Sequence, residues 1–270
     1  LDVTADLSQL ILSNSNYYVS GVTTALKADI AAAPIVIGGL SAADKVYNRN
    51  AVAVLTGTPV IASGLLGSDS ATLSGAATAG TFADSNVAAG IAVTPTLTGL
   101  SLNNSNYFIA GIDAVLTAAI TPASVTVSGL SVSNKVYDAT TAASLNGTPT
   151  AFGVLAGDTA TVSGAVSGVF VSADAGTSIA VTANLAGLSL SNSNYQITGM
   201  TAALAADIAA APLTVTADNK SMVYGSTSPA LTYAYTGLVG GDTSASFNGA
   251  IATNALPTSS VGSAYTITQG

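Results

Sequence analysis

The hexapeptide Leu12-Ser13-Asn14-Ser15-Asn16-Tyr17 decides the fold, because it returns as Leu102-Asn103-Asn104-Ser105-Asn106-Tyr107 and as Leu190-Ser191-Asn192-Ser193-Asn194-Tyr195. The three tyrosines are 90 and 88 residues apart. A second marker keeps this period: Lys45-Val46-Tyr47-Asn48 recurs as Lys135-Val136-Tyr137-Asp138 and, in variant form, as Met222-Val223-Tyr224-Gly225. Self-similarity at a fixed period indicates a tandem array of structural units.

A proline followed by β-branched residues opens each unit, at Pro34, Pro122 and Pro212. Proline is tolerated as the first residue of a strand, where its missing N–H is not needed for pairing. We therefore expect an incomplete repeat at residues 1–33, which is the C-terminal part of a unit. Two repeats at 34–121 and 122–211 follow it, and a module at 212–270 is truncated at its C-terminus.

The apolar residues alternate with polar ones, which predicts strands. The alanine-rich segment 203–211 resembles a helix by propensity, but its counterpart Leu26-Lys27-Ala28-Asp29-Ile30 alternates strictly. Period two across aligned copies outweighs the propensity of one copy. Short strands at even spacing predict an all-β fold of tandem antiparallel β-sandwich, Ig-like modules of about 88–90 residues in an elongated array.

The recurring polar turn supplies the first set of candidate site residues. Asparagine tolerates left-handed backbone and hydrogen-bonds its own main chain, so we expect Asn16, Asn106 and Asn194 to lie in turns. The tyrosines that follow, Tyr17, Tyr107 and Tyr195, should pack their rings into the core while each hydroxyl finds a partner. The alternative is a sugar-binding role for these rings. The tyrosines of the second marker, Tyr47, Tyr137 and Tyr224, are likewise interpreted as structural repeat markers.

Composition excludes several kinds of partner. Apolar residues make up 49% of the chain and charged residues only 7%, with a net charge of -8. Nucleic-acid affinity comes mainly from Lys and Arg, so nucleic acid is not an expected partner. No long apolar run predicts insertion into a membrane. The absence of cysteine favours an exported protein, although no signal peptide begins at Leu1.

The residue types present argue against catalysis. Histidine is absent, which removes the commonest general base and the usual transition-metal ligand. We predict no enzyme activity and no cofactor; an enzyme would need a site elsewhere in the parent chain. Structural calcium is a weaker possibility, because the 13 acidic residues are scattered singly rather than clustered. An intramolecular Lys–Asn cross-link is disfavoured, since such bonds commonly depend on a glutamate and there is none.

The stretch Lys135-Val136-Tyr137-Asp138-Ala139-Thr140-Thr141 resembles the YDG repeat of very large bacterial surface proteins. The last unit, with Met222-Val223-Tyr224-Gly225, looks like the related MBG module. These modules occur in exported, filamentous-haemagglutinin-like adhesins, which implies a stalk or adhesive fibre at the bacterial surface. The sequence departs from the family's Tyr-Asp-Gly pattern in two places. Asn48 stands where the family has Asp after the tyrosine, and Ala139 stands where it commonly has Gly.

The leading hypothesis is therefore a non-catalytic stalk or fibre segment of an extracellular bacterial adhesin or matrix filament, as in a biofilm. Its partners would be neighbouring modules, other copies in a filament, or a host or abiotic surface. The alternative is a module that binds carbohydrate or ice through Thr-rich faces. The first 33 residues match the part that the last module lacks. The sequence is therefore interpreted either as a window of a longer repeat protein or as a self-polymerising subunit joined by β-strand exchange.

Overall fold

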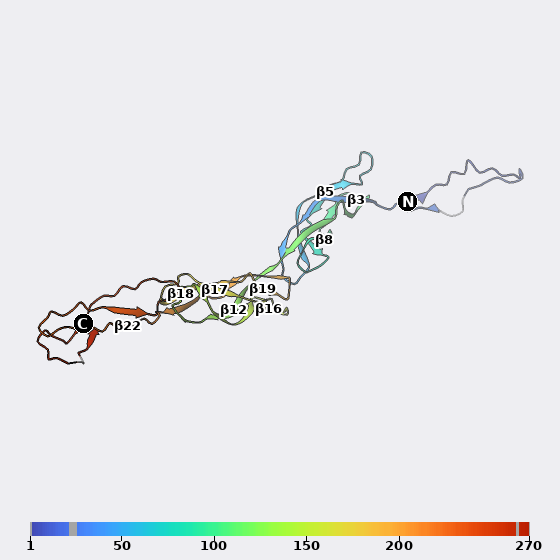
Figure 1. Ribbon diagram of the computed structural model, residues 1–270. Helices are drawn as coiled ribbons and strands as arrows, with labels where there is room; N and C mark the ends of the chain where they lie inside the picture. Colours follow the sequence, from blue (N-terminus) through green and yellow to red (C-terminus); the bar gives the residue numbers. More distant parts are fainter. Residues whose placement is uncertain (1, 22–25, 263–264, 270) are drawn as a thin grey trace. The chain divides into compact units, whose positions relative to one another are not determined.

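The computed structural model describes residues 2–21, 26–262 and 265–269, and these contain strands and turns but no helix (Figure 1). The all-β prediction is confirmed. The chain divides into two compact units, residues 1–123 and 124–270. Each is described by itself below.

The first unit contains one complete module and, before it, a short hairpin. Its strands are β1 (Asp2–Val3), β2 (Leu26–Lys27), β3 (Ala33–Ala42), β4 (Lys45–Val46), β5 (Val52–Ser63), β6 (Leu73–Gly75), β7 (Ala79–Phe82), β8 (Ala88–Pro95), β9 (Leu100–Leu102), β10 (Tyr107–Ile112) and β11 (Leu116–Thr121).

Strand β5 links the two sheet regions of this module. The strand order is β10-β3-β5-β7-β8-β11-β4, and the 12-residue strand β5 pairs with β3 at its C-terminal part and with β7 at its N-terminal part. Most pairs are antiparallel, but β10 runs parallel to β3, and β11 parallel to β4. The last strand of the module, β11, therefore lies between β8 and β4.

The second unit repeats this plan. Its strands are β12 (Ala123–Val132), β13 (Lys135–Val136), β14 (Ala142–Ala143), β15 (Leu145–Phe152), β16 (Val162–Gly164), β17 (Ser167–Phe170), β18 (Gly176–Asn184), β19 (Leu188–Leu190), β20 (Tyr195–Met200), β21 (Leu204–Ala209), β22 (Thr214–Ala217), β23 (Tyr233–Thr236), β24 (Ile251–Thr253) and β25 (Ile267–Gln269). Here β14 and β15 replace the single strand β5, so the sheets β15-β12-β20 and β13-β21-β18-β17-β14 are separate.

Alternation places the same positions in the core of both modules. Ile35 and Ile37 of β3 are fully buried, and so are their counterparts Val125 and Val127 of β12. The alanine-rich segment forms strand β21 and not a helix, with Ile208 only 2% exposed. Burial of its apolar face against β18 therefore overrides alanine's helix propensity.

Glycine is required where strands β3 and β5 approach each other. Gly57 has a φ of 91°, and a Cβ there would lie 2.2 Å from the carbonyl oxygen of Gly39. Gly147 repeats this arrangement with a φ of 97° and a 2.1 Å approach to the oxygen of Gly129. Both glycines begin a Gly-Thr-Pro sequence, at residues 57–59 and 147–149. Each lies at a close approach of two backbones that leaves no room for a larger residue.

Among the described residues before β3, the only strands are β1 and β2, which pair with Asp2 opposite Lys27. Tyr17 is 71% exposed and Ile30 is 81% exposed, whereas their counterparts Tyr195 and Ile208 are buried. Among the described residues, no strand covers these side chains.

Candidate functional site: the polar turns and the module joint

The Asn-x-Asn-Tyr turn has the same geometry in all three copies. The backbone N–H groups of Tyr17, Tyr107 and Tyr195 donate to the carbonyl oxygens three residues earlier, at 3.2–3.3 Å. In each turn the side-chain oxygen of the first asparagine accepts from the N–H two residues later at 3.0 Å. These are Asx turns, and the sequence alone produces them, because Tyr17 makes the same turn although its ring is exposed.

In the two complete modules the tyrosine ring is buried and its hydroxyl donates to an aspartate. The Tyr107 hydroxyl donates to Asp69 at 2.7 Å, and the Tyr195 hydroxyl donates to Asp158 at 2.6 Å. Each hydroxyl also accepts from a backbone N–H, that of Leu66 or Leu155. The hydrogen bond to Asp69 raises the pKa of Tyr107. A buried ring cannot offer its face to a sugar, so these two positions do not serve the carbohydrate alternative.

The turn asparagines also tie the hairpins together. Asn104 donates its side-chain amide to the carbonyl of Ser70, and Asn192 donates to that of Thr159, both at 3.2 Å. Asn106 presents its carbonyl to the N–H of Ala33 at 2.8 Å. Asn194 is 8% exposed, and Asn16 is exposed.

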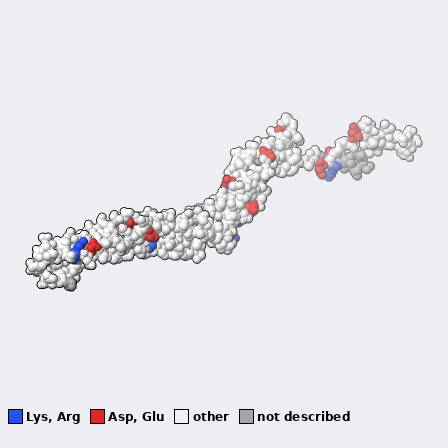
Figure 2. Space-filling view, in the orientation of Figure 1, with Lys and Arg blue, Asp and Glu red and all other residues white. Residues whose placement is uncertain are grey.

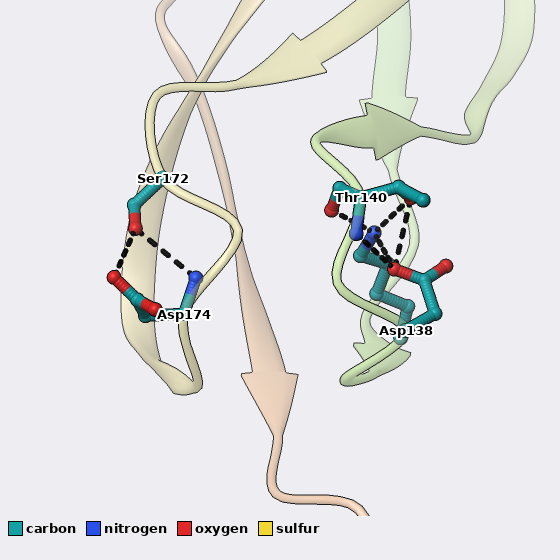
Figure 3. Close-up of polar contacts among 5 residues, drawn as sticks. Asp138, Thr140, Ser172 and Asp174 are labelled. Carbon is teal, nitrogen blue, oxygen red and sulfur yellow. Dashed lines mark hydrogen bonds and ion pairs between the residues drawn. The ribbon is translucent and has the colours of Figure 1, made fainter. Parts of the chain in front are cut away.

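The second marker forms a loop closed by a lysine (Figure 3). The Lys135 ammonium group donates to Asp138 at 2.7 Å and to the carbonyl of Thr140 at 2.6 Å. The same carboxylate oxygen accepts from the N–H and the hydroxyl of Thr140, both at 2.9 Å. The hydrogen bond from Lys135, followed by those from Thr140, lowers the pKa of Asp138 to about 2.

The first module closes the equivalent loop without a carboxylate. The Lys45 ammonium group donates to the carbonyl of Asn50 at 2.6 Å, to its side-chain oxygen at 2.8 Å and to the carbonyl of Val52 at 3.1 Å. It lies 5.6 Å from the centre of the Phe82 ring, as Lys135 lies 5.5 Å from that of Phe170. Desolvation lowers the pKa of Lys45. The lysine therefore closes the loop in both modules, a role that the sequence analysis did not assign to it.

Backbone geometry explains the glycine that the family prefers after Tyr-Asp. Ala139 has a φ of 60°, and Arg49 at the same position has a φ of 68°. Left-handed backbone of this kind costs an L-residue roughly 1–2 kcal/mol, whereas glycine adopts it readily. Ala139 and Arg49 are therefore strained substitutions.

Tyr137 joins the YDG-like module to the module that follows it within the second unit. Its hydroxyl donates to Asp242 at 3.1 Å, and this hydrogen bond raises the pKa of Tyr137. Gly240 lies so close to Ala139 that a Cβ on Gly240 would be 2.1 Å from the Ala139 methyl carbon. Strand β21 ends at Ala209 and β22 begins at Thr214. We call the contact of Tyr137 and Ala139 with Gly240 and Asp242 the module joint.

Tyr47 is 7% exposed in the first module, and Tyr224 in the last module is 64% exposed. The tyrosine of the second marker is therefore buried in one copy and exposed in another. The burial of each copy depends on which strands cover it.

The surface carries few charges (Figure 2). Among the described residues, no group of three or more His, Cys, Asp or Glu side chains could hold a metal ion. Nor does the described part of the chain contain a helix that could cross a membrane.

These features define a tandem array of all-β modules held by polar turns, lysine-clamped loops and a direct joint. The YDG domain model matches residues 31–114 and 121–202, and the MBG domain (YGX type) model matches residues 213–270. The YDG matches cover more than half of the chain, so the chain belongs to the YDG domain family and ends in an MBG module. Neither family is known as catalytic. Comparison with curated proteins and with solved structures found no match.

Proposed function

We propose that this chain is a non-catalytic segment of a structural stalk or fibre, exposed on a bacterial surface or in an extracellular matrix. YDG and MBG domains are compatible with a surface-associated module that performs no reaction. The nearly uncharged exterior, with only 7% charged residues, and the absence of histidine and cysteine support a role in spacing and contact.

The module joint is the observation that carries this proposal. A flexible tether between binding domains would need a linker rich in Gly or Ser. Here only Ala210, Ala211, Pro212 and Leu213 separate β21 from β22, and the Tyr137–Asp242 hydrogen bond connects the two modules directly. Tension applied along the chain would therefore pass from one folded module to the next.

Pulling on single molecules tests this role. With the chain held at both ends, each YDG module should unfold as a separate event that releases about 300 Å of chain, at 3.3–3.6 Å per extended residue. A deletion of residues 122–211 is the matched control, because it should remove one event and leave the other unchanged. Gradual extension without discrete events would contradict a stalk, and so would loss of both events after the deletion.

A further inference from the structure

One outer sheet face of the first YDG module is apolar. Strands β5, β7, β8, β11 and β4 lie side by side in that order, and alternate residues of each strand point to opposite sides of the sheet. One side forms the core, where Leu55, Phe82 and Ile120 are at most 5% exposed. The other side carries Val52 and Val54, each of which is 60% exposed.

The strand register places the exposed side chains on one surface. Val52 lies opposite Thr81, and Thr81 lies opposite Thr94. Strand β11 adds Thr117, which pairs with β8 on the same side. Val46 of β4 lies beside β11 and is 57% exposed. We call the surface formed by Val46, Val52, Val54, Thr81, Thr94 and Thr117 the valine face.

No charge interrupts the valine face. Strands β5, β7, β8 and β11 contain no charged residue, and Lys45 of β4 places its ammonium group over the ring of Phe82, which is buried on the inner side. The chain as a whole has a net charge of -8. Two copies of the chain therefore repel each other, and an uncharged surface is where they can meet with the least repulsion.

The size of the valine face predicts a weak and reversible contact. Five strands about 4.8 Å apart, with about five residues of about 3.4 Å each, cover an area of about 400 Å². Two such faces packed together bury about 800 Å², whereas stable complexes bury roughly 1,200–2,000 Å². An uncharged patch of this size on a single chain is typical of an interaction site.

The second YDG module has a more polar version of this face. Ser144 stands in place of Val54: their carbonyl oxygens accept corresponding hydrogen bonds from the N–H groups of Ser133 and Ala43. Asp207 of β21 adds a carboxylate to the same side of the sheet. Two copies of the second face would bring like charges together, so the contact is assigned to the first YDG module.

We propose that the valine face binds the valine face of a second copy of this chain. Because both partners use the same surface, the contact has two-fold symmetry. The β-branched side chains of the two sheets interdigitate, with the sheets about 10 Å apart. Burial of apolar area drives the association, and no pair of opposite charges is needed. This contact is separate from the module joint and does not depend on the stalk role.

Sedimentation equilibrium of the whole chain tests the proposal. The unmodified chain should form dimers reversibly as its concentration rises. Added salt should strengthen the dimer, because it screens the repulsion between two chains of net charge -8. Val54→Ser should weaken dimerisation at least tenfold. Val60→Ser is the matched control and should leave dimerisation unchanged, because Val60 is 51% exposed on the part of β5 that pairs with β3, outside the valine face.

Two further measurements separate a lost contact from a damaged fold. Serine occupies the equivalent exposed position in the second module, so the Tm of Val54→Ser should match that of the unmodified chain. In methyl NMR spectra the resonances of Val52 and Val54 should shift with concentration, and those of Val60 should not.

A chain that remains monomeric at millimolar concentration would overturn the proposal. Equal effects of the two serine variants, or a dimer that salt weakens, would overturn it as well. The stalk role would survive each of these results, because it rests on the joint between Tyr137 and Asp242.

Discussion

One isoleucine occupies the same position in three copies and differs only in burial, which makes it a sensitive test of the fold. Ile120 is 1% exposed, Ile208 is 2% exposed and Ile30 is 81% exposed. Replacement by alanine removes three carbons, which at about 0.8 kcal/mol each gives about 2.4 kcal/mol of lost burial. The remaining cavity adds to this, so Ile120→Ala and Ile208→Ala should each cost about 2–5 kcal/mol. Ile30→Ala should cost almost nothing.

Differential scanning calorimetry of the whole chain measures these effects. One kcal/mol shifts the Tm of a domain of 60–100 residues by roughly 4–8 °C, so each buried variant should lower one transition by about 10 °C or more. Ile120→Ala and Ile208→Ala should shift different transitions, because they lie in different units. Equal destabilisation by Ile30→Ala, or an unchanged thermogram for Ile208→Ala, would refute the reasoning.

Three further predictions concern the polar turns and loops. The pKa of Asp138 is lowered to about 2 in the folded state, so this carboxylate stabilises the fold above its ordinary pKa of 3.8, and the stabilisation is lost as pH falls toward 2. The Tm of the second YDG module should therefore fall over this pH range, and Asp138→Asn should abolish this part of the pH dependence. Ala139→Gly should stabilise the chain by up to about 1 kcal/mol in urea melts, because relief of the left-handed strain outweighs the added flexibility of the unfolded chain. Tyr195→Phe should destabilise the second module by about 1.5–3 kcal/mol in the same melts, since it removes a hydrogen bond to the Asp158 carboxylate.

The strands were predictable because they leave a local signal. Alternation with period two places Ile35 and Ile37 on one face of a strand, and the aligned copy at residues 26–30 corrected the helical propensity of residues 203–211. The Asx turns were predictable for the same reason, since asparagine forms them with its own backbone.

Contacts between distant residues left no such signal. Asp69 and Tyr107 are 38 residues apart in the sequence, and Tyr137 and Asp242 are 105 residues apart. Local sequence preferences do not indicate which of the 10 tyrosines a given aspartate will contact. The parallel pairs β10–β3 and β13–β21 depend on topology and not on the pattern within each strand. The Lys135–Asp138 pair is different, because a spacing of three residues was visible in the sequence and could have been weighed.

The central claim is that the YDG module at residues 122–211 and the module at residues 212–270 are coupled directly, and NMR of residues 122–270 in weak alignment measures this coupling. If the module joint holds, residual dipolar couplings from 122–211 and from 212–270 should fit one common alignment tensor. Tyr137→Phe removes only the hydroxyl that donates to Asp242 and should make the two tensors diverge. Two different tensors in the unmodified protein would show that the modules move independently, and this result would contradict the account.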